Sequence, residues 1–299
     1  MCRRNARPIT PVHHIKPRAH QNTGYGCISV SRGTRVRLNF FRLRRCHSGA
    51  QVLSFKLHLE NTRIKDVEMT QEGRRDFVKY SFFKVDPQWR RLPVSERSQS
   101  KNEFAEVVSE FSDSIAMSSY SLAGTRGDVD FMLWKICPTL EPLNDLLAQL
   151  HKTQLGSYLE MPHSYLAMTR RSPYVDTHQH EGQEGASTTM RIIGRKYLFI
   201  YPFVKTHEWY QLPLEERQRM MSQHFVIGHK YPDVKISTAY SFGLDDQEFV
   251  LGFETDDPAS FLDLVTDLRE SEARPYTERD TPIFTCVTKP LQACLDDLG

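Results

Sequence analysis

The chain lacks any apolar run of eighteen or more residues, although it is 299 residues long. A helix needs about 20 apolar residues to cross a bilayer, so no membrane span is expected. There is also no Cys-x-x-Cys spacing and no closely spaced pair of cysteine and histidine, which argues against a disulfide scaffold and a zinc site and suits a reducing cytoplasm. The six scattered cysteines are Cys2, Cys27, Cys46, Cys137, Cys286 and Cys294.

Positive charge is scarce outside the first part of the chain. Residues 1–68 contain 14 Lys and Arg against 3 Asp and Glu, whereas the remaining residues contain 25 against 34. Proteins that bind nucleic acids concentrate basic side chains on one face. An acidic body is a poor candidate for that role, so no nucleic-acid partner is expected.

The basic leader, residues 1–68, has no sustained helical or alternating apolar period. Three interpretations remain open: a transit peptide, a disordered basic arm, or translated upstream sequence that is absent from the mature protein. We favour the third, with the true start at Met69, because a short polar segment and then a clear strand pattern follow that residue.

Residues 214–228 have the pattern of an amphipathic helix with one histidine on its apolar side. Met220, Met221 and Ile227 lie three or four residues from His224 and share its face. An imidazole on a dry surface can ligate a metal, and Gly228 one turn later leaves room for a broad, flat group. On spacing alone, a satisfied core histidine is the commoner explanation of such a pattern.

The body of the chain contains the same unit twice. Residues 89–97 and 209–217 share a tryptophan, a Leu-Pro pair and a Glu-Arg pair, and each segment follows a β-rich run, at 77–85 and at 197–204. The Leu-Pro pair opens a helix in each copy, since proline is tolerated in the first turn. Turns at 127–131 and 244–249 then separate two strand-like runs.

Each copy continues into a second helix and a closing strand, which gives the order β-α-β-β-α-β of a ferredoxin-like unit. We place the helices near 140–151 and 259–269, and the closing strands near 165–170 and 283–286. Two such sheets can close into one barrel with helices outside. The sequence therefore predicts an α+β fold in which duplicated ferredoxin-like units form a dimeric α+β barrel within one chain, with halves at 69–171 and 193–299 joined by a linker at 172–192.

The two copies are not equivalent. His224 has no histidine counterpart in the first copy, where residues 103–107 occupy the corresponding helix. We therefore expect the first half to be structural and the second half to carry the site.

An ordered series of motifs in the second half carries a resemblance to a known family. The motifs are Tyr201-Pro202-Phe203-Val204-Lys205, Trp209-Tyr210-Gln211-Leu212-Pro213, Glu216-Arg217, His224 with Gly228, Tyr231-Pro232-Asp233-Val234, Gly243-Leu244-Asp245-Asp246 and Leu268-Arg269-Glu270-Ser271-Glu272-Ala273-Arg274. From about Asp76 to Val287 the sequence resembles the chlorite dismutase-like superfamily of haem-binding α+β barrels, and within it the coproheme decarboxylases.

The resemblance implies roles for several residues. His224 takes the place of the axial iron ligand, and Glu272 that of a carboxylate hydrogen-bonded to its outer nitrogen. Tyr201 matches a tyrosine that forms a radical and takes hydrogen from a propionate. Lys205 matches a lysine near the propionates; Arg274 and Arg126 are further candidates for binding these carboxylates.

The side of the porphyrin opposite His224 distinguishes members of the superfamily. Members that degrade chlorite have an arginine on the strand after the histidine, and one group of decarboxylases has glutamine, whereas the matching residue here is Ile236. Isoleucine cannot hydrogen-bond to an anion, which disfavours chlorite chemistry. Decarboxylases with an apolar residue there use a linker histidine as general base, which matches His178, with His180 as the alternative.

The resemblance thus implies peroxide-dependent decarboxylation of iron coproporphyrin III, or coproheme, to haem b through a three-propionate intermediate, as the final step of haem biosynthesis. Two alternatives remain: a chlorite dismutase-type haem enzyme, or a haem-binding or haem-sensing protein without turnover. The family also implies a cytoplasmic homo-oligomer, commonly a pentamer, in transient contact with a ferrochelatase.

Overall fold

The computed structural model describes residues 75–174 and 190–299 of the chain, which belong to one compact unit, residues 65–299. The leader and the linker histidines His178 and His180 lie outside the described residues.

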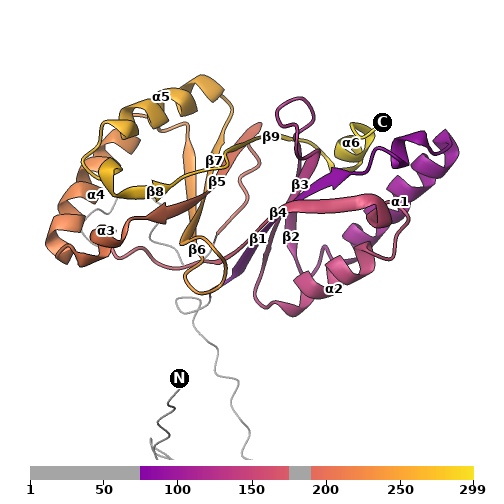
Figure 1. Cartoon of the computed structure of the whole chain (residues 1–299), viewed down its shortest axis with the longest axis horizontal. Helices are drawn as coiled ribbons and strands as arrows, with labels where there is room; N and C mark the ends of the chain where they lie inside the picture. The colour runs from indigo at the N-terminus through magenta and orange to yellow at the C-terminus, as the bar shows by residue number, and fades with distance from the viewer. Residues whose placement is uncertain (1–74, 175–189) are drawn as a thin grey trace, which may run out of the picture. The chain divides into compact units, whose positions relative to one another are not determined.

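The first half follows the predicted order of elements (Figure 1). Its first strand covers the nine residues that the alternating pattern predicts, and its closing strand begins earlier than predicted, at Leu159. The elements are β1 (Phe77–Val85), α1 (Val94–Glu110), β2 (Ala116–Ser121), β3 (Phe131–Cys137), α2 (Glu141–Leu150) and β4 (Leu159–Met168).

The second half repeats this order with two additions. A short strand β8 pairs with β5, and a final helix α6 follows the closing strand. The short helix α3 before the long one corresponds to a 3-10 turn, Trp89–Arg91, in the first half. The elements are β5 (Tyr197–Lys205), α3 (His207–Gln211), α4 (Leu214–Gly228), β6 (Lys235–Tyr240), β7 (Phe249–Thr255), α5 (Pro258–Arg269), β8 (Thr277–Arg279), β9 (Phe284–Thr288) and α6 (Leu291–Asp296).

Matching hydrogen bonds at the same place in both halves support the duplication. In the first half, the Asp130 carboxylate accepts a bond from the backbone N–H of Val85 at 2.9 Å. In the second half, the Glu248 carboxylate accepts one from the backbone N–H of Lys205 at 2.7 Å. Each acid directly precedes a strand, β3 or β7, and ties it to the end of the first strand of its unit.

The strands close into a barrel, as the sequence predicts. The sheet runs β7-β6-β4-β1-β3-β2-β9-β5, and β5 pairs again with β7, which completes the ring. One seam is thin, because β4 and β6 pair only through Met168 and Tyr240. A closed barrel leaves no free sheet edge within the ring.

Successive side chains of each strand point alternately into the barrel interior and toward the helices outside. The interior is a continuous apolar core to which both halves contribute, including Val78, Tyr80, Trp134, Ile200 and Phe284. Side chains at the intervening positions face the helices, because successive residues of a strand point to opposite faces.

Helices α1, α2 and α6 cover the outer face of the first half, and α3, α4 and α5 lie against the second half (Figure 1). The C-terminal helix α6 is thus placed with the first half, where Cys294 and Leu295 are buried among residues of β1, β3 and α1. The sequence pattern did not predict that this helix packs on the first half.

Proline fixes where the two long helices begin. Pro93 and Pro213 precede α1 and α4 with extended backbones, as the repeated Leu-Pro pair predicts. In α5, the Asp257 carboxylate caps the helix by accepting a hydrogen bond from the N–H of Ala259 at 3.0 Å.

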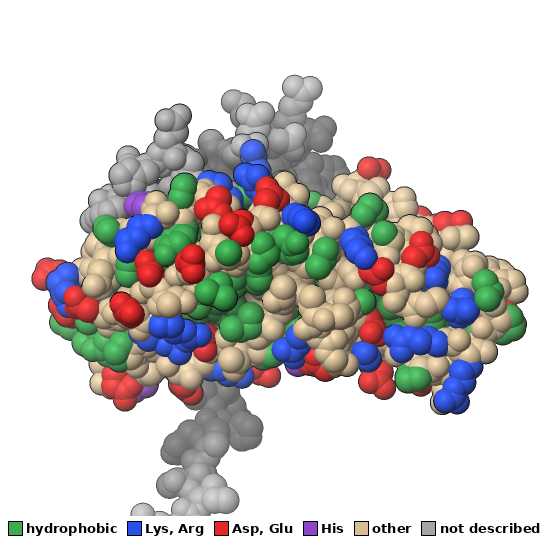
Figure 2. Space-filling view, turned by 90° about the horizontal axis from the view of Figure 1, so that it is seen from above, with side chains coloured by type: hydrophobic (Ala, Val, Ile, Leu, Met, Phe, Trp, Pro, Cys, Tyr) green, Lys and Arg blue, Asp and Glu red, His purple; other side chains and the backbone are tan. Residues whose placement is uncertain are grey.

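Charges of both signs are interspersed on the face drawn in Figure 2, with apolar side chains between them. None of the helices in the described part of the chain has the length and apolar character that crossing a bilayer requires.

Candidate functional site

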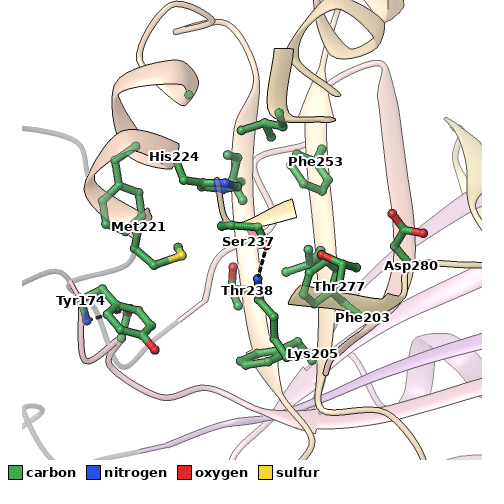
Figure 3. Close-up of a pocket in the computed structure, with 18 of the residues that line it drawn as sticks. Tyr174, Phe203, Lys205, Met221, His224, Ser237, Thr238, Phe253, Thr277 and Asp280 are labelled. Carbon is green, nitrogen blue, oxygen red and sulfur yellow. Dashed lines mark hydrogen bonds between the residues drawn. The ribbon is translucent and has the colours of Figure 1, made fainter. Parts of the chain in front are cut away.

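A large cavity lies in the second half, between helix α4 and the outward faces of β5, β6 and β7 (Figure 3). Its volume is about 730 Å³. Sites for cofactors and drug-sized ligands commonly enclose about 300–1,000 Å³ with mostly apolar walls and a few polar groups. The walls here follow that description: Phe203, Leu251 and Phe253 are apolar, and Lys205 and Arg274 are charged.

His224 projects from α4 into this cavity, toward the strand that carries Phe253 (Figure 3). No described residue forms a hydrogen bond with its imidazole in the structure. Removal from water, and to a lesser extent the charge of Lys205, lower the pKa of His224 from 6.5 to about 4. The ring is therefore neutral at pH 7 and has a lone pair available for a metal.

The surroundings of His224 fit an iron porphyrin better than a bare ion. Within residues 75–174 and 190–299, no three side chains of His, Cys, Asp or Glu converge to hold a metal. A single imidazole can hold a metal whose other bonds come from elsewhere, as they do in a porphyrin. One turn along, Gly228 faces open space, since a Cβ there would meet no heavy atom within 4 Å.

Tyr201 lines the same cavity from the middle of β5. Its side chain is 8% exposed, and its ring stacks on Phe253 with centroids 5.6 Å apart. Burial first, and the negative charge of Asp280 second, raise the pKa of the phenol well above its usual value. Tyr201 therefore keeps its proton at any physiological pH.

Lys205, at the end of β5, brings a positive charge to the cavity wall. Its ammonium group donates to the backbone carbonyl of Ala273 at 3.2 Å and lies 4.2 Å from the centre of the Trp209 ring. Burial, followed by the charge of Arg274, lowers the pKa of Lys205 to about 8. The lysine is thus mostly charged at pH 7 but close to losing its proton.

A second charged group in the wall consists of two arginines that share one carboxylate. Asp280 accepts a bond from Nη1 of Arg269 and another from Nη1 of Arg274, each at 2.6 Å. All three line the cavity. Two guanidinium groups with one carboxylate leave a net positive charge, which suits an anionic ligand.

Two members of this group, Arg269 and Asp280, were not predicted from the sequence as site residues. Arg269 stands in the last turn of α5, where a basic residue needs no ligand to explain it. Asp280 follows the short strand β8, which the sequence did not predict. An acid after a strand and before a Thr-Pro pair is only a weak signal of a site.

Ile236 lines the cavity from β6 and is 36% exposed. Its aliphatic side chain can neither donate a hydrogen bond nor hold an anion. The structure therefore brings Ile236, His224, Tyr201, Lys205 and Arg274 to one cavity, although they come from four separate segments of the chain.

Two residues predicted for the site lie elsewhere. The Glu272 carboxylate accepts a bond from Arg219 at 2.5 Å on the exposed side of α4, instead of reaching His224. Arg126 is absent from the cavity wall: it binds the Asp128 carboxylate with two nitrogens and donates to the carbonyl of Ile283. Each side chain already has a strong opposite charge within reach, which explains its position.

The chain matches the sequence model of the chlorite dismutase family over residues 61–289. It is 35% identical over 167 residues to a coproheme decarboxylase from Mycolicibacterium smegmatis. The aligned segment covers 56% of this chain and 70% of that protein.

Solved structures of similar fold include a substituted variant of the chlorite dismutase from Candidatus Nitrospira defluvii, with a TM-score of 0.69 and 26% identity over 76% of this chain and 95% of that one. The fold is also similar to that of a haem-binding protein from Thermus thermophilus, with a TM-score of 0.63 and 23% identity over 75% of this chain and 94% of that one. At this last identity, the likeness concerns the fold alone.

Proposed function

The chain belongs to the chlorite dismutase family, and from this premise we propose that it is an enzyme that converts coproheme to haem b with hydrogen peroxide. Two propionates of iron coproporphyrin III are oxidatively decarboxylated in turn, through a three-propionate intermediate, in the last step of haem biosynthesis. The similarity to a coproheme decarboxylase supports this choice within the family.

One observation carries the proposal: a neutral histidine, a buried tyrosine and a cluster of cations share one cavity large enough for a porphyrin. In the proposed complex, His224 holds the iron of the substrate through its free lone pair. The iron, when bound, supplies the oxidising chemistry with peroxide, and the protein supplies position and charge.

Lys205, Arg274 and Arg269 are the proposed partners of the propionates. The two arginines are already held by Asp280, so they are ordered before a ligand arrives. Ordering in advance lowers the entropy cost of binding. Each new bond between a guanidinium or ammonium group and a carboxylate is charge-assisted and therefore strong.

Tyr201 is the proposed hydrogen-transfer residue. It gives up its phenolic hydrogen as an electron and a proton, and the phenoxyl radical then takes a hydrogen atom from the β-carbon of a propionate. Loss of one more electron releases carbon dioxide and leaves a vinyl group. Overall, one propionate, one peroxide and one proton give one vinyl group, carbon dioxide and two waters.

Peroxide must lose a proton before it reacts, and Ile236 cannot accept one. We propose His178 for this role, with His180 as the alternative. On the same premise we propose a cytoplasmic homopentamer that makes transient contact with a ferrochelatase.

The test is mass spectrometry of the porphyrin after the protein is mixed with coproheme and peroxide. We expect two successive losses of the mass of carbon dioxide and two hydrogens. Tyr201→Phe should bind coproheme but release no carbon dioxide, and Tyr197→Phe, on the same strand but outside the cavity wall, should react like the unmodified protein.

Three results contradict the proposal in different ways. Turnover by Tyr201→Phe removes the radical role. Oxygen evolution from chlorite favours the chlorite-degrading alternative. If peroxide only bleaches the bound coproheme, with no mass loss, the protein is a haem carrier or sensor.

A further inference from the structure

A row of easily oxidised side chains leads from the wall of the cavity into the barrel interior. The row consists of Met190, Tyr80 and Trp134, and none of them has a part in the proposed decarboxylation. Met190 lines the cavity and also packs against the interior core. It is therefore a direct connection between the two spaces.

Contacts are continuous along the row. The sulfur of Met190 lies 4.0 Å from the hydroxyl of Tyr80. The ring of Tyr80 stacks on that of Trp134, with centroids 5.5 Å apart and an angle of 29° between the planes. A thioether sulfur is a weak acceptor for a hydroxyl, and stacked aromatic rings are a favourable contact. The gaps between the three side chains are short enough for an electron to move from one to the next.

The environment of Trp134 is unusual for a buried tryptophan. Its side chain is fully buried, and its Nε1–H has no partner among the described residues. Trp89 is equally buried, but its Nε1–H donates to Ser100 at 3.1 Å. An unpaired buried donor costs about 1–3 kcal/mol, and a phenylalanine would fill space without that cost. Besides its size, a tryptophan offers an electron that is readily removed.

Glu254 brings a negative charge to the same interior. Its side chain is almost fully buried and accepts bonds from the backbone N–H groups of Ile193, Gly194 and Arg195. After burial and Tyr120, this charge contributes to the raised pKa of Tyr80. A negative charge in a dry interior also stabilises the positive charge that Trp134 acquires when it loses an electron.

We propose that Met190, Tyr80 and Trp134 form an electron path that reduces the oxidised porphyrin site when no propionate is available to react. This inference rests on the proposed function, because peroxide and the bound porphyrin supply the oxidant. The path protects the cavity wall, including Tyr201, from damage.

The reaction balances with one peroxide. Tyr80 and Trp134 each give one electron, which passes beside the Met190 sulfur to the cavity. Tyr80 also loses its phenolic proton, on the side of the cavity, while Trp134 keeps its N–H and becomes a radical cation. With this proton and one more from solvent, the peroxide becomes two waters.

The path can be tested without decarboxylation by loading the protein with haem b, the proposed product, and adding one equivalent of peroxide. Electron paramagnetic resonance of samples frozen at successive times then follows the appearance of a tryptophan radical. We expect this radical in the unmodified protein and expect it to be lost in Trp134→Phe.

The three tryptophans of the chain allow matched controls, Trp89→Phe and Trp209→Phe. Trp89→Phe should retain the signal. Trp209 lies in the cavity wall and is the competing source, so a signal that survives in Trp134→Phe but disappears in Trp209→Phe overturns the proposal. So does the absence of any tryptophan radical. Trp134→Phe removes an unpaired donor and should therefore fold.

Met190→Leu, which conserves volume, tests the first step and should slow formation of the Trp134 radical several-fold.

A second readout is peptide mass spectrometry after peroxide treatment of the protein loaded with haem b. Oxygen addition at Trp134 should fall in Met190→Leu and rise at Tyr201. An unchanged pattern contradicts the path, whereas failure of coproheme to lose mass contradicts only the proposed function.

Discussion

The two halves of the barrel have the same fold, but the layer between the sheet and the outer helices differs. Side chains fill this layer in the first half, whereas in the second half it contains the cavity. In the first half, the rings of Phe83, Phe104 and Phe131 pack together between the sheet and α1, with centroids 4.9 to 6.4 Å apart. The equivalent positions of the second half hold Phe203, His224 and Phe249. There, Phe203 and Phe249 still touch, at 6.2 Å, but His224 faces the cavity.

A few substitutions account for this difference. Relative to the repeated Trp-x-x-Leu-Pro motif, Phe104 corresponds to His224 and the buried Val108 corresponds to Gly228. Each change removes apolar volume between helix and sheet. A duplicated unit can therefore keep its stability in one copy while the other copy gives up packing for a binding site.

Replacing the histidine of the second half by its counterpart in the first half should have the largest effect on ligand binding. His224→Phe introduces the side chain of the first half and removes the imidazole that we propose holds the iron. We expect the Soret band of the coproheme complex to change to that of unligated coproheme. His207→Ala, at an exposed histidine of α3, is the control and should leave the spectrum unchanged.

A matched pair of truncations measures the packing difference. Phe83→Ala should lower the free energy of unfolding by about 3–5 kcal/mol, since it empties space in a closed core. Phe203→Ala should cost less than half of that, because its side chain already borders the cavity. Urea denaturation of both variants provides the measurement, and equal losses would show that the second half is as tightly packed as the first.

Charge in the second half should make ligand binding depend on pH. Because the pKa of Lys205 is lowered to about 8, its positive charge disappears as pH rises through that value. Affinity for iron-free coproporphyrin III should then fall, by about tenfold if one charge-assisted bond of roughly 1.4 kcal/mol is lost. Fluorescence titrations between pH 6.5 and 9.5 test this.

Lys205→Arg is the control for that prediction, because the charge of arginine persists to high pH.

The lowered pKa of Lys205 also makes the stability of the fold depend on pH, with a defined sign. The folded-state pKa lies below the usual lysine value of 10.5, so the unfolded chain binds more protons between about pH 8 and 10.5. The contribution of Lys205 therefore destabilises the fold below pH 8 and vanishes toward pH 10.5.

The smallest effect is expected from Glu272→Gln. The pair of Glu272 with Arg219 is exposed, and such pairs add little to stability. Resonance Raman spectroscopy of the iron–histidine stretch is the sharper measurement. An unchanged frequency agrees with the pairing in the structure, and a lowered one would mean that Glu272 turns to His224 in the complex.

Local sequence signals predicted most of the fold. The bounds of β1 and α4 follow from strand alternation and from the Leu-Pro start of the helix. The position of α6 could not be predicted in this way, because its partners in the first half are far away in sequence. The bond from Lys101 to Asp296, for example, joins residues 195 positions apart.

The site was predicted less completely, for a physical reason. His224, Tyr201 and Lys205 stand in recognisable motifs, whereas Arg269 and Asp280 matter only through a contact across a turn. The prediction for Glu272 took account of its sequence position but not of Arg219, which competes for the same carboxylate. Sequence identifies groups capable of chemistry, and the competition between their partners appears only in three dimensions.

The position of α6 on the first half has a consequence for how the chain folds during synthesis. Arg90 donates to the carbonyl of Leu298, and Leu298 itself is buried in the core of the first half. During synthesis on the ribosome, the core of the half that emerges first therefore stays incomplete until residues 291–298 have been translated. A gene split at the linker would place the first half and helix α6, which completes its core, on separate chains.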